Sequence, residues 1–225
     1  MILTLAITLL LLRGTEGYSI GSKWPKNNLK WRLINTLPNT NCETLLPIFE
    51  KAFKTWSDVA NITFTPTNDN RADISISFVL WDIFSESLAR AYFPDTELKG
   101  VIEIDENQKW NLGLNEHSLN NSISLLQVVT HEIGHTLGIY DSLDKDDIMF
   151  HTYLIDRSLK GLSYNDIVAI EQLYGRKTAQ QWASVSPQYT AMVTRWIELQ
   201  RQYLENRSKE LQNLHETIDI NGRIP

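Results

Sequence analysis

The stretch HEIGHTLGIYD, residues 131–141, constrains this chain more than any other feature. His131 and His135 are four residues apart, so a helix places both imidazoles on one face, where they can bind one zinc ion. Glu132 lies between them and can act as general base toward a water molecule that the zinc activates. Gly138 tolerates the backbone conformation that ends a helix, so the chain can turn and bring a third ligand to the metal.

A histidine is the expected third ligand at position 141, but this chain carries Asp141 there. The competing interpretation of the whole stretch is an ordinary amphipathic helix with two solvated histidines. The long form of the motif, with a helix-ending glycine and a residue at 141 that can bind metal, favours the zinc site.

Length and composition suit one sizeable domain with a short additional element, because 42% of the 225 residues are hydrophobic. The net charge of −6 argues against a nucleic-acid partner. Residues 1–12 form an apolar run that is short for a membrane span, which predicts a signal peptide over residues 1–17 and a secreted protein. An uncleaved anchor is the alternative, because the run lacks a basic start. Cys42 is the only cysteine, so no internal disulfide can form.

Hydrophobic periodicity predicts alternating strands and helices before residue 175. Strands are expected at 30–35, 62–65, 73–79, 88–93 and 101–104. Helices are expected at 41–60, from Ser118 or Asn120 to about Leu137, and at 163–174. Ser163 and Asp166 have the spacing of a capping box, which marks the start of the last of these helices.

The chain changes character after Gly175. A helical stripe of apolar residues runs from about 188 to 219, which predicts a helical tail over residues 176–225. The stripe favours docking of the tail on its own domain, with tail-mediated self-association or membrane contact as the alternatives. We therefore expect a catalytic domain over residues 18–175 between the signal peptide and the tail.

With this layout, the chain resembles the catalytic domain of the matrix metalloproteinases, within the metzincin zinc endopeptidases, over about residues 22–175. The resemblance is carried by KW at 23–24, LKWRL at 29–33, AFKTW at 52–56, ADISISF at 72–78, LARAY at 88–92, LS at 162–163, DI at 166–167 and LYG at 173–175. Met149, in DIMF, falls where the family has its Met-turn, a hydrophobic floor beneath the zinc ligands. The resemblance implies an α+β fold with a twisted five-stranded mixed sheet and three helices, to which the tail adds a C-terminal helix.

The resemblance also implies a secreted, zinc-dependent endopeptidase that cleaves extracellular proteins, with matrix proteins as the family-level expectation. Substrate would pair in extended form with the edge strand near Ala89, Ala91 and Tyr92. Tyr153 would wall the pocket for the residue after the cleaved bond. Gln127 resembles the residue that sets the depth of this pocket, and its size points to an intermediate depth.

The third zinc ligand is a clear departure from the family pattern. A carboxylate oxygen binds zinc at about 2.0–2.2 Å, and some metzincin-like proteases look similar in using aspartate here. We therefore expect Asp141 to be the third ligand, with His151 as the alternative. A ligand set with one more negative charge would make the zinc a weaker Lewis acid.

The ion sites elsewhere in the family also differ. Arg90 and Glu103 stand where the family has histidines of a second, structural zinc site, so we expect one zinc ion. Asp105 remains from a calcium cluster, but Gln108 replaces an expected acid, which leaves calcium binding open. The family's cysteine-bearing latency segment is not evident between Gly17 and Lys23.

Two other classes of function compete with an active endopeptidase. The first is a catalytically weak or inactive protease-like binding module, against which the intact Glu132 argues. The second is an interaction protein that works through its tail, with the domain as scaffold.

Overall fold

The computed structural model describes residues 17–81, 87–114, 122–154, 161–178 and 209. The chain divides into two compact units, Met1–Lys177 and Thr178–Pro225. All but the last residue of the predicted signal peptide, and most of the predicted helical tail, lie outside the described residues.

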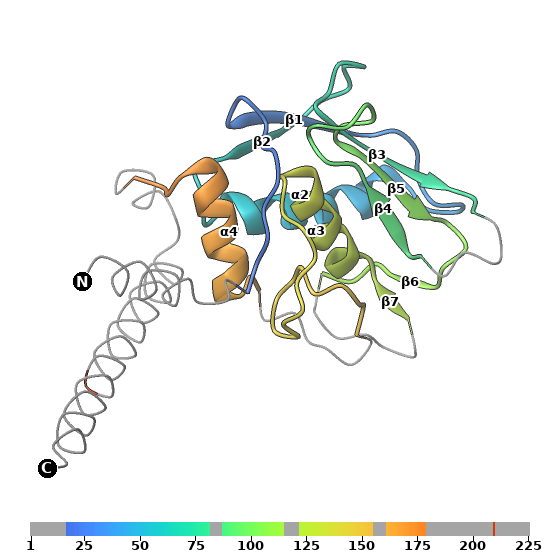
Figure 1. The fold of residues 1–225 in the computed structure, drawn as a ribbon. Coiled ribbons are helices and arrows are strands. Elements are labelled where there is room, and N and C mark those ends of the chain that lie inside the picture. The colour runs from blue at the N-terminus through green and yellow to red at the C-terminus, as the bar shows by residue number, and fades with distance from the viewer. Residues whose placement is uncertain (1–16, 82–86, 115–121, 155–160, 179–208, 210–225) are drawn as a thin grey trace, which may run out of the picture. The chain divides into compact units, whose positions relative to one another are not determined.

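Within the described part of the first unit, five strands form one mixed sheet (Figure 1). Their order across the sheet is β2-β1-β3-β5-β4, and every neighbouring pair is parallel except the antiparallel pair β5 and β4. The strands are β1 (Asn28–Leu33), β2 (Thr63–Pro66), β3 (Ile74–Val79), β4 (Ala89–Ala91) and β5 (Val101–Asp105). The predicted five-stranded mixed sheet is therefore confirmed, and β4 forms one of its edges.

A second, smaller pair of parallel strands lies between β5 and the next helix in the sequence. Its members are β6 (Trp110–Asn111) and β7 (Ile123–Ser124). Each has two residues, which is too short for a visible alternation of polar and apolar side chains. The sequence analysis did not expect them.

The described residues form three helices, as predicted: α2 (Cys42–Ser57), α3 (Leu125–Thr136) and α4 (Tyr164–Tyr174). Asn41 caps α2 by accepting a hydrogen bond from the backbone of Thr44, at 2.9 Å. The capping box expected at the start of α4 is present.

Helix α3 begins later than the expected caps Ser118 or Asn120, which themselves lie outside the described residues. Ser124 is its N-cap and accepts a hydrogen bond from the backbone N–H of Gln127, at 3.2 Å. Because Ser124 also ends β7, the chain passes directly from strand to helix. The helix that carries both histidines therefore starts next to a strand.

The hydrophobic core lies between the sheet and the helices α2 and α3, which pack against each other below it in Figure 1. Trp31 of β1 stacks on Phe53 of α2, with ring centroids 4.8 Å apart. The indole N–H of Trp56 donates to the backbone oxygen of Thr130, at 2.9 Å, and so joins α2 to α3. Large buried aromatic side chains of this kind supply much of the apolar area that stabilises a domain.

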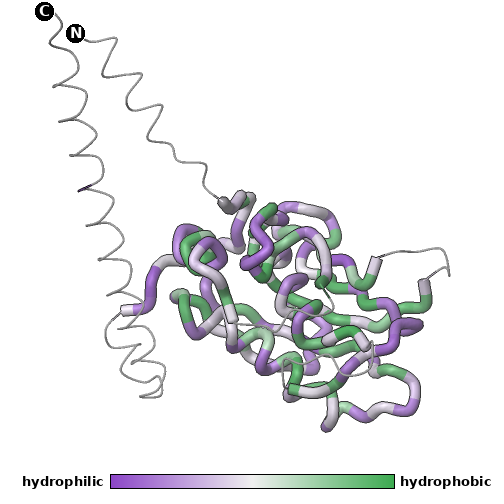
Figure 2. Tube along the Cα trace, turned by 90° about the horizontal axis from the view of Figure 1, so that it is seen from below, coloured by the Kyte–Doolittle hydropathy of each residue, from purple (hydrophilic) through white to green (hydrophobic). Residues whose placement is uncertain are grey.

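Hydrophobic and hydrophilic residues are interspersed along the described chain (Figure 2). Strand β3 illustrates the pattern, because every second residue from Ile74 to Phe78 is buried. Among the described residues, no helix is both long and apolar enough to cross a bilayer.

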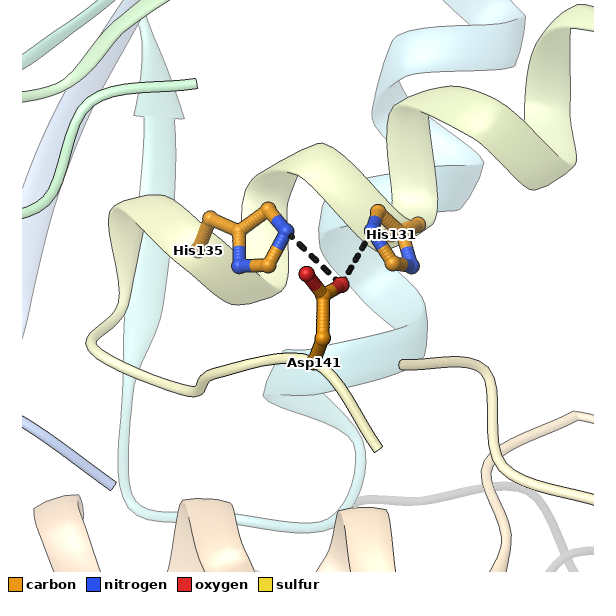
Figure 3. Close-up of side chains that lie close together, drawn as sticks. All are labelled: His131, His135 and Asp141. Carbon is orange, nitrogen blue, oxygen red and sulfur yellow. Dashed lines mark ion pairs between the residues drawn. The ribbon is translucent and has the colours of Figure 1, made fainter. Parts of the chain in front are cut away.

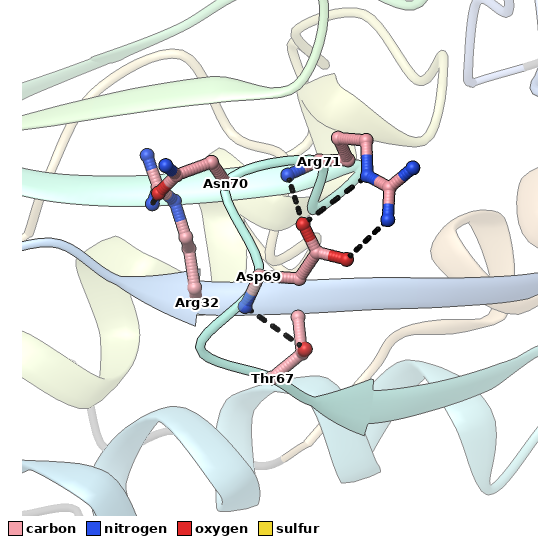
Figure 4. Close-up of polar contacts among 5 residues, drawn as sticks. All are labelled: Arg32, Thr67, Asp69, Asn70 and Arg71. Carbon is pink, nitrogen blue, oxygen red and sulfur yellow. Dashed lines mark hydrogen bonds and ion pairs between the residues drawn. The ribbon is translucent and has the colours of Figure 1, made fainter.

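A polar loop, residues 67–73, connects β2 to β3, and Figure 4 shows polar contacts within it and with Arg32. The carboxylate of Asp69 accepts hydrogen bonds from the backbone N–H of Arg71, at 2.9 Å, and from its guanidinium. These bonds hold the pKa of Asp69 below its ordinary value. Arg32 donates to the side-chain oxygen of Asn70, at 2.6 Å, which ties the loop to β1.

Candidate metal centre

Helix α3 places His131 and His135 side by side, with ring centroids 4.6 Å apart. The Nδ1 atom of His131 lies 2.9 Å from the carbonyl oxygen of Ile148, and that of His135 lies 2.8 Å from the carbonyl oxygen of Ile139. A carbonyl oxygen can only accept, so each Nδ1 carries a hydrogen, and in the neutral form of each ring the lone pair lies on Nε2. The lone pair of each Nε2 is therefore available to a metal ion, as in protein zinc sites.

The turn after α3 brings a carboxylate to these two rings. Gly138 has a φ of +100°, and a Cβ there would lie 2.3 Å from the backbone oxygen of Ser22. Its own carbonyl oxygen accepts a hydrogen bond from the N–H of Gly21, at 2.7 Å. The chain then reverses, and Asp141 points back at both histidines (Figure 3).

The spacing of this group fits zinc. The Oδ1 atom of Asp141 lies 3.4 Å from the Nε2 atoms of both His131 and His135. A charge-assisted hydrogen bond would be about 2.7–2.9 Å long. Ligands bound tetrahedrally at about 2.0–2.1 Å from zinc are separated by about 3.3–3.4 Å, which the observed distance matches.

Within the described part of the chain, these three residues form the one group of potential metal ligands, with ligand atoms within 4.8 Å of one another. The side chain of Asp141 is 54% exposed, while the two histidines are mostly covered. The group is therefore open on one side, as a catalytic zinc site requires for water or substrate.

Electrostatic attraction within the group favours a positive charge at its centre. The imidazoles of His131 and His135 hold the pKa of the Asp141 carboxyl well below its ordinary range. Burial opposes a charge on His131, but Asp141 and Glu132 outweigh it and raise the pKa of that imidazole. The same negative groups would attract a dication, so protons and metal compete for this site.

Glu132 is buried and lines the same cavity as the three candidate ligands. Burial raises the pKa of its carboxyl above the ordinary value, while the neighbouring His131 and His135 act in the opposite direction. A carboxylate in such surroundings is a stronger base than one in water.

Met149 is buried against the helix between the two histidines. A Cβ placed on Gly134 would meet the Sδ atom of Met149 at 2.3 Å, which shows how closely the sulfur approaches the backbone of α3. The carboxylate of Asp166 accepts the backbone N–H groups of Ile148, at 2.7 Å, and Met149, at 3.3 Å. Burial raises the pKa of Asp166. The turn with Met149 is thus fastened to the start of α4.

A cavity of about 740 Å³ extends from the candidate ligands along β4 and the first part of α3. Four of the five expected cleft residues line it: Ala89, Ala91, Gln127 and Tyr153. The fifth, Tyr92, is not among the lining residues, and both of its backbone groups bond toward β5. The hydroxyl oxygen of Tyr153 accepts the backbone N–H of Ser124, at 2.8 Å, so this wall is tied to the start of α3.

Two aromatic residues of the cavity wall were missed in the sequence. The ring of Phe93 contacts that of His135, at 5.3 Å between centroids, and that of Tyr140, at 4.6 Å. The one signal in the sequence that could have placed Tyr140 in the cavity wall is that it directly precedes Asp141. Phe93 comes from the segment after β4, and only the folded chain brings it to the site.

His151, the alternative third ligand, lies at the exposed rim of the cavity. Its Nδ1 atom pairs with the hydroxyl of Thr152, at 2.8 Å, and its ring contacts Phe150. It does not belong to the group formed by His131, His135 and Asp141.

The residues that the resemblance assigned to further ion sites make contacts with other residues of the same chain. The guanidinium of Arg90 lies 3.9 Å from the carboxylate of Glu103 and 5.1 Å from the ring centre of Trp81. The buried carboxylate of Asp105 accepts hydrogen bonds from the side-chain amide of Gln108, at 2.6 Å, and from a neighbouring backbone N–H.

A family profile and several known proteins are similar to this chain in sequence. The sequence profile of the matrixin family matches residues 23–175. Stromelysin-2 of Rattus norvegicus is 33% identical over 175 residues, which cover 73% of this chain and 35% of the relative. Interstitial collagenase of Sus scrofa is 32% identical over 161 residues, which cover 68% of this chain and 33% of the relative. Matrix metalloproteinase-18 of Xenopus laevis is 34% identical over 169 residues, which cover 70% of this chain and 34% of the relative. The chain thus spans about a third of the length of these relatives.

Proposed function

Because this chain belongs to the matrixin family, we propose that it is a zinc endopeptidase whose metal is held by His131, His135 and Asp141. The observation that carries the proposal is the 3.4 Å spacing of Asp141 Oδ1 from both imidazole Nε2 atoms. Zinc bound there supplies Lewis acidity, which polarises a peptide carbonyl and makes a water molecule more acidic.

Glu132 is the general base in this proposal. Of the described residues that line the cavity, it is the only carboxylate besides Asp141. A carboxylate oxygen of Glu132 takes a proton from the attacking water and then delivers it to the nitrogen of the leaving amine. Its burial in the same cavity as the three candidate ligands supports this role.

Strand β4 binds the substrate backbone. The oxygen of Leu88 accepts from Asp105, and Tyr92 exchanges hydrogen bonds with the start of β5. Because hydrogen bonding alternates along an antiparallel pair, the backbone groups of Ala89 and Ala91 face the open edge. An extended peptide adds there as a further strand, next to the candidate metal ligands. The residue after its cleaved bond enters the pocket walled by Tyr153.

The substrates we propose are secreted proteins, including those of the extracellular matrix. Two observations support this choice: the apolar run at the start of the sequence, and the names of the relatives, interstitial collagenase and matrix metalloproteinase-18. Detection of the chain in the medium of expressing cells, and its loss on removal of residues 1–17, would test secretion.

The enzyme proposal is tested by zinc content and peptide cleavage, measured on the same preparations. We expect one zinc ion per chain and chelator-sensitive cleavage of a quenched peptide library. Glu132→Gln should retain zinc and lose at least about 100-fold in kcat/KM, within the usual contribution of a general base. The matched control is Glu97→Gln, at an exposed site outside the cavity, which should cleave like wild type.

Other outcomes separate the competing functions. Zinc binding with no cleavage by wild type would favour a protease-like binding module. Normal turnover by Glu132→Gln would refute the assignment of Glu132 as the base. Absence of zinc would contradict the ligand group itself.

A further inference from the structure

Asp141 differs from the two histidines of the metal group in how its side chain is held. The Nδ1 atom of His131 bonds to the carbonyl oxygen of Ile148, and that of His135 bonds to the carbonyl oxygen of Ile139. Among the described residues, only the two imidazoles lie in polar contact with the carboxylate of Asp141. A carboxylate that binds a metal is normally directed by a hydrogen bond from an outer partner. Another kind of contact must therefore direct Asp141.

Tyr140, which directly precedes Asp141, carries a ring with two close neighbours. One is the ring of Phe93, with the two centroids 4.6 Å apart and the planes at 32°. The other is the backbone at Gly21, where an added Cβ would lie 2.9 Å from the hydroxyl oxygen of Tyr140. Ring pairs at such distances attract each other beyond the effect of the area they bury. The ring of Tyr140 is therefore held in place, although 43% of the residue is exposed.

Phe93 also contacts one of the metal-binding histidines. Its ring centroid lies 5.3 Å from that of His135. Because Phe93 follows the edge strand β4, it belongs to a segment distant in sequence from the whole metal group. Ring contacts through Phe93 thus connect His135 to Tyr140, the residue before Asp141. We call Phe93 and Tyr140 the aromatic brace.

Backbone hydrogen bonds hold the residues on either side of Asp141. The N–H of Tyr140 donates to the carbonyl oxygen of Ser19, at 2.9 Å, and the N–H of Ser142 donates to that of Met149, at 2.7 Å. These bonds fix the neighbours of Asp141, but they do not reach its carboxylate. Aspartate has a shorter side chain than histidine, so a small shift of the turn would carry its oxygen away from the two imidazoles.

We propose that Phe93 and Tyr140 are positioning residues, whose ring contacts hold the turn so that the carboxylate of Asp141 stays directed at the metal. This inference rests on the proposed function, because it requires a metal at this group. The ring contacts do for Asp141 what an outer hydrogen bond does for other carboxylate ligands. Loss of an outer partner lowers metal affinity by about 10–100-fold, and we expect about tenfold for the loss of one ring.

The test measures zinc affinity without substrate, so a changed fit of peptides in the cavity does not affect the result. Phe93→Leu and Tyr140→Leu should each bind zinc about tenfold more weakly than wild type, in competition with a metal-sensitive dye. Tyr140→Phe should keep the wild-type affinity, since it retains the ring. The visible absorption of cobalt(II) bound in place of zinc should change in both leucine variants, because it depends on ligand geometry.

Phe64→Leu is the matched control. Phe64 is half-buried like Phe93 and contacts the ring of Phe53, at 4.8 Å between centroids, but it does not line the cavity. This variant should lose stability and keep the zinc affinity and cobalt spectrum of wild type. Gly21→Ala disturbs the brace from outside the cavity, because its methyl group would displace the ring of Tyr140. It should weaken zinc binding, and it serves as the test should a leucine variant fail to fold.

A double-mutant cycle separates the two members of the metal group that the brace touches. If the brace acts through Asp141, Phe93→Leu should reduce zinc affinity much less in an Asp141→Ala background than in wild type. An undiminished reduction would show that Phe93 acts through His135 alone, and it would overturn the proposal.

The remaining outcomes distinguish the inference from the function on which it rests. Wild-type zinc affinity in Phe93→Leu, Tyr140→Leu and Gly21→Ala would overturn the inference and leave the zinc endopeptidase intact. An equal loss of affinity in Phe64→Leu would also overturn it, because the effect would then follow from lower stability. If wild type binds no zinc, the proposed function fails and the inference fails with it.

Discussion

Met149 packs so closely against Gly134 that a single methyl group at position 134 would lie 2.3 Å from its sulfur. Gly134 is the residue just before His135, so the contact lies directly behind one of the candidate zinc ligands. A glycine in a helix usually costs stability, and here the close approach of the sulfur explains why it is needed. The hydrophobic floor and the ligand-bearing helix are therefore one packed unit.

Gly134→Ala should destabilise the folded chain by about 1–3 kcal/mol, as overpacking of a core does. It should also weaken zinc binding, since either Met149 or the helix must move. Denaturant unfolding and competition with a chelator would measure the two effects. Met149→Ala should relieve the clash, so the double variant should be less destabilised than the sum of the two single variants. Strict additivity would contradict the proposed contact.

Asp141→Ala should weaken zinc binding by more than about 100-fold, since loss of even an indirect partner of a ligand costs about 10–100-fold. His151→Ala should leave zinc affinity near that of wild type, because His151 lies outside the ligand group. Competition with a metal-sensitive dye would rank the two variants. The opposite ranking would move the third ligand to His151.

Asp166→Asn should destabilise the turn that carries Met149. The Oδ2 atom of Asp166 accepts the N–H groups of Ile148 and Ser163, while its Oδ1 atom accepts that of Met149. Asparagine has one side-chain oxygen, so its amide would face at least one backbone N–H that needs an acceptor. We expect a loss of about 1–3 kcal/mol in the free energy of unfolding. Stability equal to wild type would show that the turn is held by other contacts.

Calcium should leave the unfolding temperature unchanged. The buried carboxylate of Asp105, which the resemblance placed in a calcium cluster, accepts a hydrogen bond from the side-chain amide of Gln108, at 2.6 Å. Gln108→Ala removes this partner and should lower stability by about 1 kcal/mol. Thermal unfolding at increasing calcium concentration, for wild type and variant, is the measurement. A rise in the unfolding temperature of wild type with calcium would refute the idea that the side-chain amide of Gln108 takes the place of a calcium ion at Asp105.

The sequence predicted those helices and strands that are marked by patterns among residues close together in the chain. Asn41 and the pair Ser163 and Asp166 fall at helix starts because capping depends on residues a few positions apart. The start of α3 was misplaced because its cap, Ser124, sits at the end of a strand that is too short to recognise. Local patterns therefore gave the element types and most of their order.

The proximity of the three candidate metal ligands was predictable for a similar reason. Positions 131, 135 and 141 are related by one helix and one glycine turn, so their proximity follows from local geometry. The position of Phe93 beside His135 depends on how distant segments pack. No periodicity in the sequence encodes such contacts.

The shortness of β4 has a consequence for the behaviour of the protein in solution. An exposed sheet edge invites other copies of the chain to pair with it and start aggregates. Strand β4 has only three residues, and the one at its centre, Arg90, is exposed and charged. An edge of this length has enough backbone hydrogen-bonding groups to bind one extended peptide. It has too few to pair stably with the sheet of a second copy. The opening that would admit substrate is thereby protected from self-assembly.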